Sequence, residues 1–267
     1  MSRQFILDLP PNLEAYRPQL EKTIKPFVEI EIEPSDEVTL WQSKFGGVPY
    51  FPKKIEYPRT ADGKYLYLLA QINFLELPPL EGFPQKGILQ FYIADDGLYG
   101  ADFSELREQN GFRVLYFEKP SLSPKNLIQD FSFLPEPEDL PINSINQCYC
   151  LKFSHQYEFI SPHDYRCLEL LGDQLENKIA DYIDEQWDED DDLFNSCGHK
   201  LGGYPCFVQE DPRESSGNSE EAYELLLQID SEEEIMWGDS GVCNFFIKPS
   251  DLKQKNFSDI LYNWDCG

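Results

Sequence analysis

The chain is poor in basic residues. Its 267 residues include 22 Lys and Arg against 49 Asp and Glu, which gives a formal net charge of −27. Nucleic-acid binding needs clustered Lys and Arg that displace counterions, and docking on anionic membranes needs the same sign of charge. We therefore expect no nucleic acid and no membrane among its partners. The surplus of carboxylates instead favours attraction to a basic protein.

Long apolar runs are also missing. Phe5-Ile6-Leu7 is interrupted by Asp8, and no stretch approaches the ~20 apolar residues that span a membrane. A signal peptide needs a longer apolar region behind a basic start, so we expect a cytoplasmic protein. Apolar residues still make up 41% of the chain and aromatic residues 14%, which is typical of a chain with a buried core.

The seven cysteines and three histidines lack the spacing of known sites. Cys197, His199 and Cys206 lie close together without the paired spacing of a structural zinc site, so we predict no metal and no cofactor. The cysteines are interpreted as reduced, buried, small side chains. Ser240, in Gly238-Asp239-Ser240-Gly241, is interpreted as part of a turn. We therefore predict no catalytic residue, and a hydrolytic enzyme ranks third among the candidate functions.

One phrase occurs twice in the chain. Lys44-Phe45-Gly46-Gly47-Val48-Pro49-Tyr50-Phe51 returns as Lys200-Leu201-Gly202-Gly203-Tyr204-Pro205-Cys206-Phe207, with five of eight positions identical. Two further blocks follow in the same order: 68–73 matches 225–230, and 87–93 matches 241–247. We interpret this as an internal duplication within a single domain, residues 1–267, with repeats at about 38–118 and 195–264.

Sequence patterns along the chain predict short strands and few helices. Val28–Glu33 alternates strictly, as a half-buried strand does. Further strands are expected at about 39–42, 66–72, 88–93, 113–117 and 149–153, and helices at 13–27, 161–171 and 173–187. These segments predict an α+β fold that is internally duplicated, with mostly antiparallel sheet halves and a few flanking helices.

The repeated Lys-x-Gly-Gly-x-Pro turn is the best-defined motif. Paired glycines permit positive φ, and the backbone amides of such a turn can cradle an anion with help from the lysine. A tight turn kept for its shape is the alternative interpretation. If the repeats face each other, one cleft could hold both turns, and the candidate ligand-binding residues are Lys44, Gly46, Gly47, Lys200, Gly202 and Gly203.

An acidic run extends from residue 184 to 192, with seven acids among nine residues. Its spacing fails as a calcium-binding EF-hand loop. It is interpreted as a solvated helix end or, because Trp is favoured at the centre of interfaces, as a contact for a partner. The candidate partner-binding residues are Asp184, Glu185, Trp187, Asp188, Glu189, Asp190, Asp191 and Asp192.

Both repeated phrases, together with Trp237-Gly238-Asp239-Ser240-Gly241 and Leu261-Tyr262-Asn263-Trp264-Asp265-Cys266, resemble the YwqG-like proteins, a bacterial domain family of unknown function. The likeness covers nearly the whole chain. It implies a duplicated α+β fold and a bacterial cytosolic setting, and it carries no catalytic residues. Some members lie near toxin genes, which suggests an immunity or antitoxin role at the level of the family.

Two functional hypotheses follow. The first is a non-enzymatic binding protein whose acidic surface takes a basic protein partner, in an immunity-like or antitoxin-like role. The alternative is a protein that binds a small ligand or anion in a cleft between the two repeats.

Overall fold

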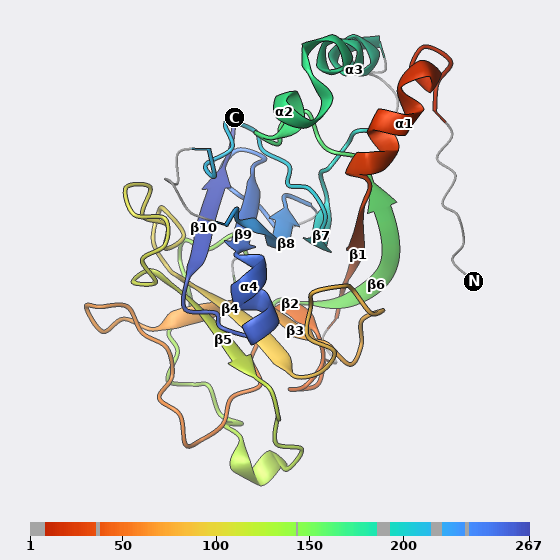
Figure 1. Cartoon of the computed structure of the whole chain (residues 1–267). Helices are drawn as coiled ribbons and strands as arrows, with labels where there is room; N and C mark the ends of the chain where they lie inside the picture. The colour runs from red at the N-terminus through yellow and green to blue at the C-terminus, as the bar shows by residue number, and fades with distance from the viewer. Residues whose placement is uncertain (1–8, 36–37, 143, 186–192, 215–220, 233–234) are drawn as a thin grey trace.

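One antiparallel sheet makes up most of the molecule. The computed structural model describes residues 9–35, 38–142, 144–185, 193–214, 221–232 and 235–267. Within them, the strands follow one another across the sheet in the order β10-β9-β8-β7-β1-β6-β2-β3-β4-β5 (Figure 1). Their bounds are β1 Lys25–Pro34, β2 Lys44–Gly46, β3 Leu66–Asn73, β4 Ile88–Ala94, β5 Phe112–Phe117, β6 Cys148–Glu158, β7 His199–Gly202, β8 Glu224–Asp230, β9 Val242–Ile247 and β10 Ile260–Asp265.

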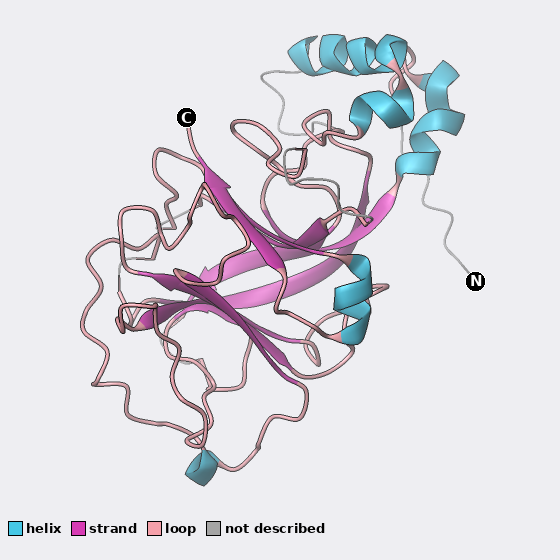
Figure 2. Cartoon of the chain, turned by 60° about the vertical axis from the view of Figure 1, so that its left-hand side comes forward, coloured by secondary structure: helices cyan, strands magenta, loops and turns pink. Residues whose placement is uncertain are grey.

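The prediction of an α+β fold is wrong. The sheet curls until it is nearly a closed barrel (Figure 2). Its two edge strands approach each other: the ring of Phe112 on β5 lies 5.0 Å from that of Tyr262 on β10. The backbone N–H of Tyr262 also donates to the carbonyl of Leu106, in the connection that leads to β5, at 2.9 Å. A sheet that curls onto itself buries its own apolar face and needs no covering layer of helices.

The helices are shorter than expected and stand at the margins of the sheet. They are α1 (Arg17–Leu20), α2 (Cys167–Leu171), α3 (Asp173–Glu185) and α4 (Pro249–Gln254). The first three gather at one end of the barrel, and α4 lies beside it (Figures 1 and 2). Apolar spacing suggested a helix over 13–27, but only one short α-helix forms there, because the chain enters β1 at Lys25. The strand expected at 39–42 is also absent: the chain turns there, and β2 begins at Lys44.

The two halves of the sheet exchange a strand. β1 precedes the first repeat in sequence, yet it pairs with β7 of the second; β6 precedes the second repeat, yet it pairs with β2 of the first. β1 and β6 then pair with each other along their whole length. Each half of the sheet therefore contains a strand from the other half of the sequence.

The core lies inside the curled sheet and draws on both halves. Phe91 on β4 and Phe245 on β9 occupy matching positions of the two repeats, and their rings lie 4.8 Å apart. Both are fully buried. A smaller apolar cluster joins the helices to one end of the sheet, and it includes Leu175 and Ile179 of α3.

Two of the cysteines are paired. Cys197 and Cys206 form a disulfide with their Cα atoms 5.0 Å apart. The interpretation of all seven cysteines as reduced is therefore wrong for this pair. The two residues lie on either side of β7 and bring together the ends of the segment that carries the second Gly-Gly turn.

Candidate functional site

The two Gly-Gly turns share one backbone conformation. Their φ angles are +67° and +68° at Gly46 and Gly47, and +72° and +74° at Gly202 and Gly203. L-residues with a Cβ rarely adopt this left-handed region, so glycine is required by the path of the chain itself.

A buried amide holds each turn in the same way. The backbone N–H of Tyr50 donates to Oε1 of Gln71 at 2.8 Å, and that of Cys206 donates to Oε1 of Gln228 at 2.7 Å. Each Nε2 group donates in turn to two carbonyls of the segment before its turn, those of Leu40 and Gln42 in one half and of Ser196 and Gly198 in the other. The turns are thus part of a buried polar scaffold. Their origin by duplication stays a prediction.

The two lysines of the motif are buried rather than exposed. Nζ of Lys44 donates to the carbonyls of Thr39 at 2.7 Å and Val48 at 3.1 Å, and burial lowers the pKa of Lys44 to about 8. Nζ of Lys200 lies 2.8 Å from Oε2 of Glu158, which is also buried, and burial lowers the pKa of Lys200. Each ammonium group is therefore used within the chain.

The structure does not bring the two turns to a common cavity. Gly202 and Gly203 line a mostly apolar cavity of about 300 Å³ between the halves, together with Leu80 and Phe83 from the first. Gly46 and Gly47 border a different and very small one. Neither Lys44 nor Lys200 lines either of these cavities.

A third cavity, of about 650 Å³, has the most one-sided charge. Its lining includes Glu29 and Glu31 of β1, Glu158 of β6, and Glu232 after β8, and no Lys or Arg of the described residues lines it. We refer to it as the acidic cavity. Ser154 and Gln156, which are neutral, donate to Oε2 of Glu29 at 2.8 and 3.1 Å, so the charge of Glu29 is held in place without a cation.

The acidic cavity lies beside β1, just beyond the first residue of β7. β1 pairs with β7 only over Phe27–Ile30, whereas on its other side it pairs with β6 as far as Pro34. Among the described residues, the stretch from Glu31 to Pro34 therefore has a strand partner on one side alone. This leaves a short open edge of sheet beside the carboxylates, and such edges accept an added strand.

His199 closes the inner wall of the acidic cavity. Its side chain is fully buried at the start of β7, and Nδ1 accepts a hydrogen bond from the backbone N–H of Asp230 at 2.9 Å. Nε2 therefore carries the proton, and it lies 3.0 Å from Oε2 of Glu232. Burial lowers the pKa of His199 to about 4. At neutral pH the ring is uncharged and does not offset the glutamates.

Acidification should destabilise the protein through His199. The unfolded chain takes up a proton near the ordinary histidine pKa of about 6.5, whereas the folded chain does so only near 4. The contribution of neutral His199 to the free energy of unfolding is thus intact above about pH 6.5. As the pH falls toward 4, the free energy of unfolding decreases by roughly 3 kcal/mol. Urea unfolding at pH 7 and pH 4.5 measures it. In His199→Gln the loss between the two pH values should be smaller; an equal loss would contradict this role.

The predicted partner-binding run lies mostly outside the described residues. Residues 186–192, with Trp187 and five of the acids, fall there, and Asp184 and Glu185 are the last residues of α3. The chain resumes at Leu193, which lines the acidic cavity. In sequence, the run ends one residue before Leu193. Of the cavity residues, Glu29 and Glu31 could have been identified from the alternating pattern of β1, but no local pattern marks Glu158 or Glu232.

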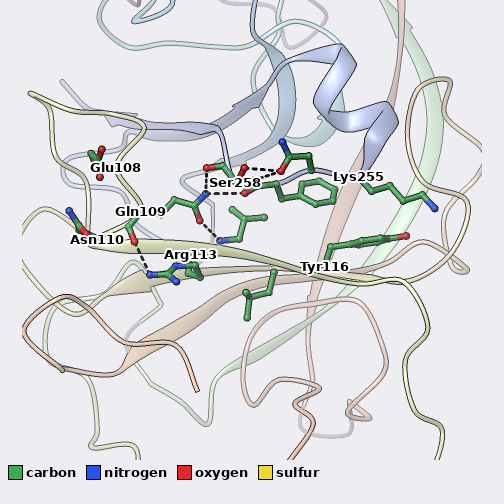
Figure 3. A pocket seen from close by; sticks show the side chains of 11 residues that line it. Glu108, Gln109, Asn110, Arg113, Tyr116, Lys255 and Ser258 are labelled. Atoms are coloured by element: carbon green, nitrogen blue, oxygen red, sulfur yellow. Dashed lines mark hydrogen bonds between the residues drawn. The ribbon is translucent and has the colours of Figure 1, made fainter. Parts of the chain in front are cut away.

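The seam between the sheet edges forms another cavity, of about 610 Å³ (Figure 3). Gln109 points across it: Nε2 donates to the carbonyls of Phe257 at 2.9 Å and Ser258 at 3.2 Å, while Oε1 accepts from the N–H of Val114 at 3.0 Å. The side-chain amide of Gln109 thereby links the edge strand β5 to the segment before β10, where no described strand pairs with β5. We assign this cavity to closure of the barrel.

Other kinds of site find little support in the part of the chain that is described. Its His, Cys, Asp and Glu side chains form no group of three or more that could hold a metal ion. Gly238–Ser240 form a turn before β9, with Ser240 at φ +59°. No described helix has the length and apolar character needed to cross a membrane.

Comparison with known proteins identifies a family without a known activity. The chain matches the model of a family described as "Domain of unknown function (DUF1963)" over residues 43–266, and it belongs to this family. No curated protein matches it.

Proposed function

We propose that this protein is a non-enzymatic, cytoplasmic binding protein of the bacterial YwqG-like type, and that its acidic cavity takes a basic segment of a protein partner. An immunity-like or antitoxin-like role is the form of this activity that the family resemblance suggests. The observation that carries the proposal is the lining of the acidic cavity, with four glutamates and no Lys or Arg among the described residues.

The charge of the acidic cavity supports a basic segment as its ligand. Glu31 is exposed and the side chain of Glu232 is 54% exposed, so both can meet an incoming cation without first being uncovered. Glu158 is already bound by Lys200, and the lining also contains the carboxylates of Glu29, Glu31 and Glu232. A lysine or arginine entering the cavity would replace water around them with charge-assisted hydrogen bonds.

Backbone geometry supports an extended segment. The open edge of β1 at Glu31–Pro34 offers main-chain groups for pairing, and alternate side chains of an added strand would point toward the glutamates. Main-chain pairing would supply affinity independent of sequence, and the carboxylates would select for basic residues. The adjoining acidic run of 184–192 would draw such a partner toward the cavity over a longer range.

A charge-neutralised variant tests the site. Glu29→Gln, Glu31→Gln and Glu232→Gln combined should weaken binding of a labelled octa-arginine peptide at least 10-fold at low salt, measured by fluorescence anisotropy. Wild-type binding should also weaken as salt shortens the screening length, which is about 10 Å at 0.1 M.

The matched control separates this cavity from diffuse attraction to an acidic protein. Glu105→Gln, Glu138→Gln and Glu210→Gln change three exposed glutamates outside the cavity and alter the net charge equally. The control should bind within about 2-fold of wild type. Equal weakening in both variants would show that net charge alone attracts the peptide and would overturn the proposal. In cell lysate, the partner should be retained by wild type and the control and lost by the cavity variant.

A further inference from the structure

A second charged cavity has the opposite sign. Lys53, Lys54, Lys119 and Lys125 line one hollow of about 620 Å³. The chain has only 22 basic residues against 49 acidic ones, so this concentration runs against its overall charge. The four lysines are exposed and come from three segments: the stretch after the first Gly-Gly turn, the stretch after β5, and the short 3-10 turn at Pro124–Asn126.

The floor of this basic cavity is apolar and aromatic. Tyr50, Ile55 and Phe117 contribute to it, and the rings of Tyr50 and Phe117 meet edge to face at 5.2 Å. Tyr50 is almost fully buried, and its hydroxyl accepts a hydrogen bond from the N–H of Ser121 at 2.7 Å. A ligand here would rest on a fixed aromatic surface with ammonium groups at its rim.

Backbone hydrogen bonds hold the walls together. The N–H of Lys53 donates to the carbonyl of Asn126, and the N–H of Ile128 donates to that of Phe51, each at 2.9 Å. Nζ of Lys53 also donates to the carbonyl of Lys125 at 3.1 Å. The lysines therefore project from a braced frame that is already in place before any ligand arrives.

The positive charge is only partly offset within the described chain. Glu118 is the only carboxylate among the lining residues, and it forms an ion pair with Lys255. None of the four lysines has a described carboxylate within ion-pair distance of its Nζ atom. Four like charges around one hollow repel each other, and that repulsion is relieved when an anion binds.

We propose that the basic cavity binds a small polyanion, with phosphate or carboxylate groups at the lysines and an apolar or aromatic body on the floor. Its volume lies within the range of small-molecule sites, about 300–1,000 Å³. A long polyanion such as nucleic acid would meet the net charge of −27 beyond the cavity, whereas a small one would not. The site shares no residue with the acidic cavity and is independent of the function proposed for it.

Titration calorimetry at low salt tests the basic cavity with three probes: tripolyphosphate, citrate, and ATP without metal. We expect at least one to bind with a stoichiometry of one, and ATP to bind more tightly than tripolyphosphate if its ring reaches the floor. Lys54→Gln combined with Lys119→Gln should weaken binding at least 10-fold. Neither side chain is used in a hydrogen bond within the described chain, so the variant should fold normally, as circular dichroism will show.

The control is Lys22→Gln combined with Lys253→Gln, which removes two exposed lysines elsewhere on the surface. It should bind as wild type does. No binding of any probe, or equal weakening in the two variants, would overturn the proposal. Binding to anionic lipid vesicles in place of the free probes would assign the lysines to a membrane surface and would overturn it as well.

Discussion

Replacing Lys200 by alanine should lower the free energy of unfolding by about 3–5 kcal/mol, which is the usual cost of stranding one partner of a buried ion pair. Both Lys200 and Glu158 are buried, with Nζ and Oε2 2.8 Å apart. The other oxygen of Glu158 accepts from the N–H of Tyr204 at 2.5 Å. Without Lys200, the carboxylate must stay charged in a dry site or take up a proton. Urea unfolding at pH 7 measures the loss.

Two further variants show whether the loss in Lys200→Ala comes from the unpaired charge. Lys200→Met combined with Glu158→Gln removes both charges at similar volume and should recover most of the stability, because the amide oxygen still accepts from Tyr204. Lys44→Ala, at the matching position of the first repeat, leaves two carbonyls without a donor but strands no charge, so it should cost only about 1–3 kcal/mol. A Lys200→Ala loss no greater than that of Lys44→Ala would contradict the role of the ion pair.

Gly203→Ala should lower the free energy of unfolding by about 3–5 kcal/mol. The residue has φ +74°, where a side chain with a Cβ costs roughly 1–2 kcal/mol. A Cβ would also lie 2.0 Å from Oε1 of Glu158 and 2.9 Å from Cβ of Phe27. The added atom would push the carboxylate out of line with Lys200, so backbone strain and disruption of the ion pair add together.

Gly63→Ala provides the matched control. Gly63 has a still larger positive φ, +88°, but nothing lies within 4 Å of the position that a Cβ would take there. It should therefore show the backbone cost alone, about 1–2 kcal/mol. Chemical unfolding compares the two variants, and soluble yield with limited proteolysis replaces it if Gly203→Ala does not fold. Equal losses in free energy of unfolding would mean that the close packing around Gly203 adds nothing to the backbone cost, and would contradict the prediction.

Much of the local structure can be predicted from short patterns. Strict alternation from Val28 to Glu33 falls within β1, and the apolar runs at 66–72 and 88–93 fall within β3 and β4. The paired glycines were expected to adopt positive φ, and all four do. These properties depend on neighbours in sequence: side-chain period along a strand, and the absence of a Cβ at a turn.

The fold class could not be predicted in the same way. Apolar spacing over 13–27 is compatible with a long helix, but that stretch forms only two 3-10 turns and the short α1 before β1 begins at Lys25. The order of strands depends on which edges meet, and no strand sequence specifies its neighbour strongly enough to reveal that β1 lies beside β7 and β6 beside β2.

The sequence by itself determined the repeated turns, the strand periods and the acidic balance of this protein, because each depends on residue type or on local spacing. Only the tertiary structure decided what those features do. Lys44 is buried among carbonyls of its own turn, whereas the packing of β6 near β7 buries Lys200 against Glu158, although the two lysines occupy matching places in the repeated phrase. Contacts between segments that are far apart in the chain also bring Glu29 near Glu232, and Lys53 and Lys54 near Lys119 and Lys125.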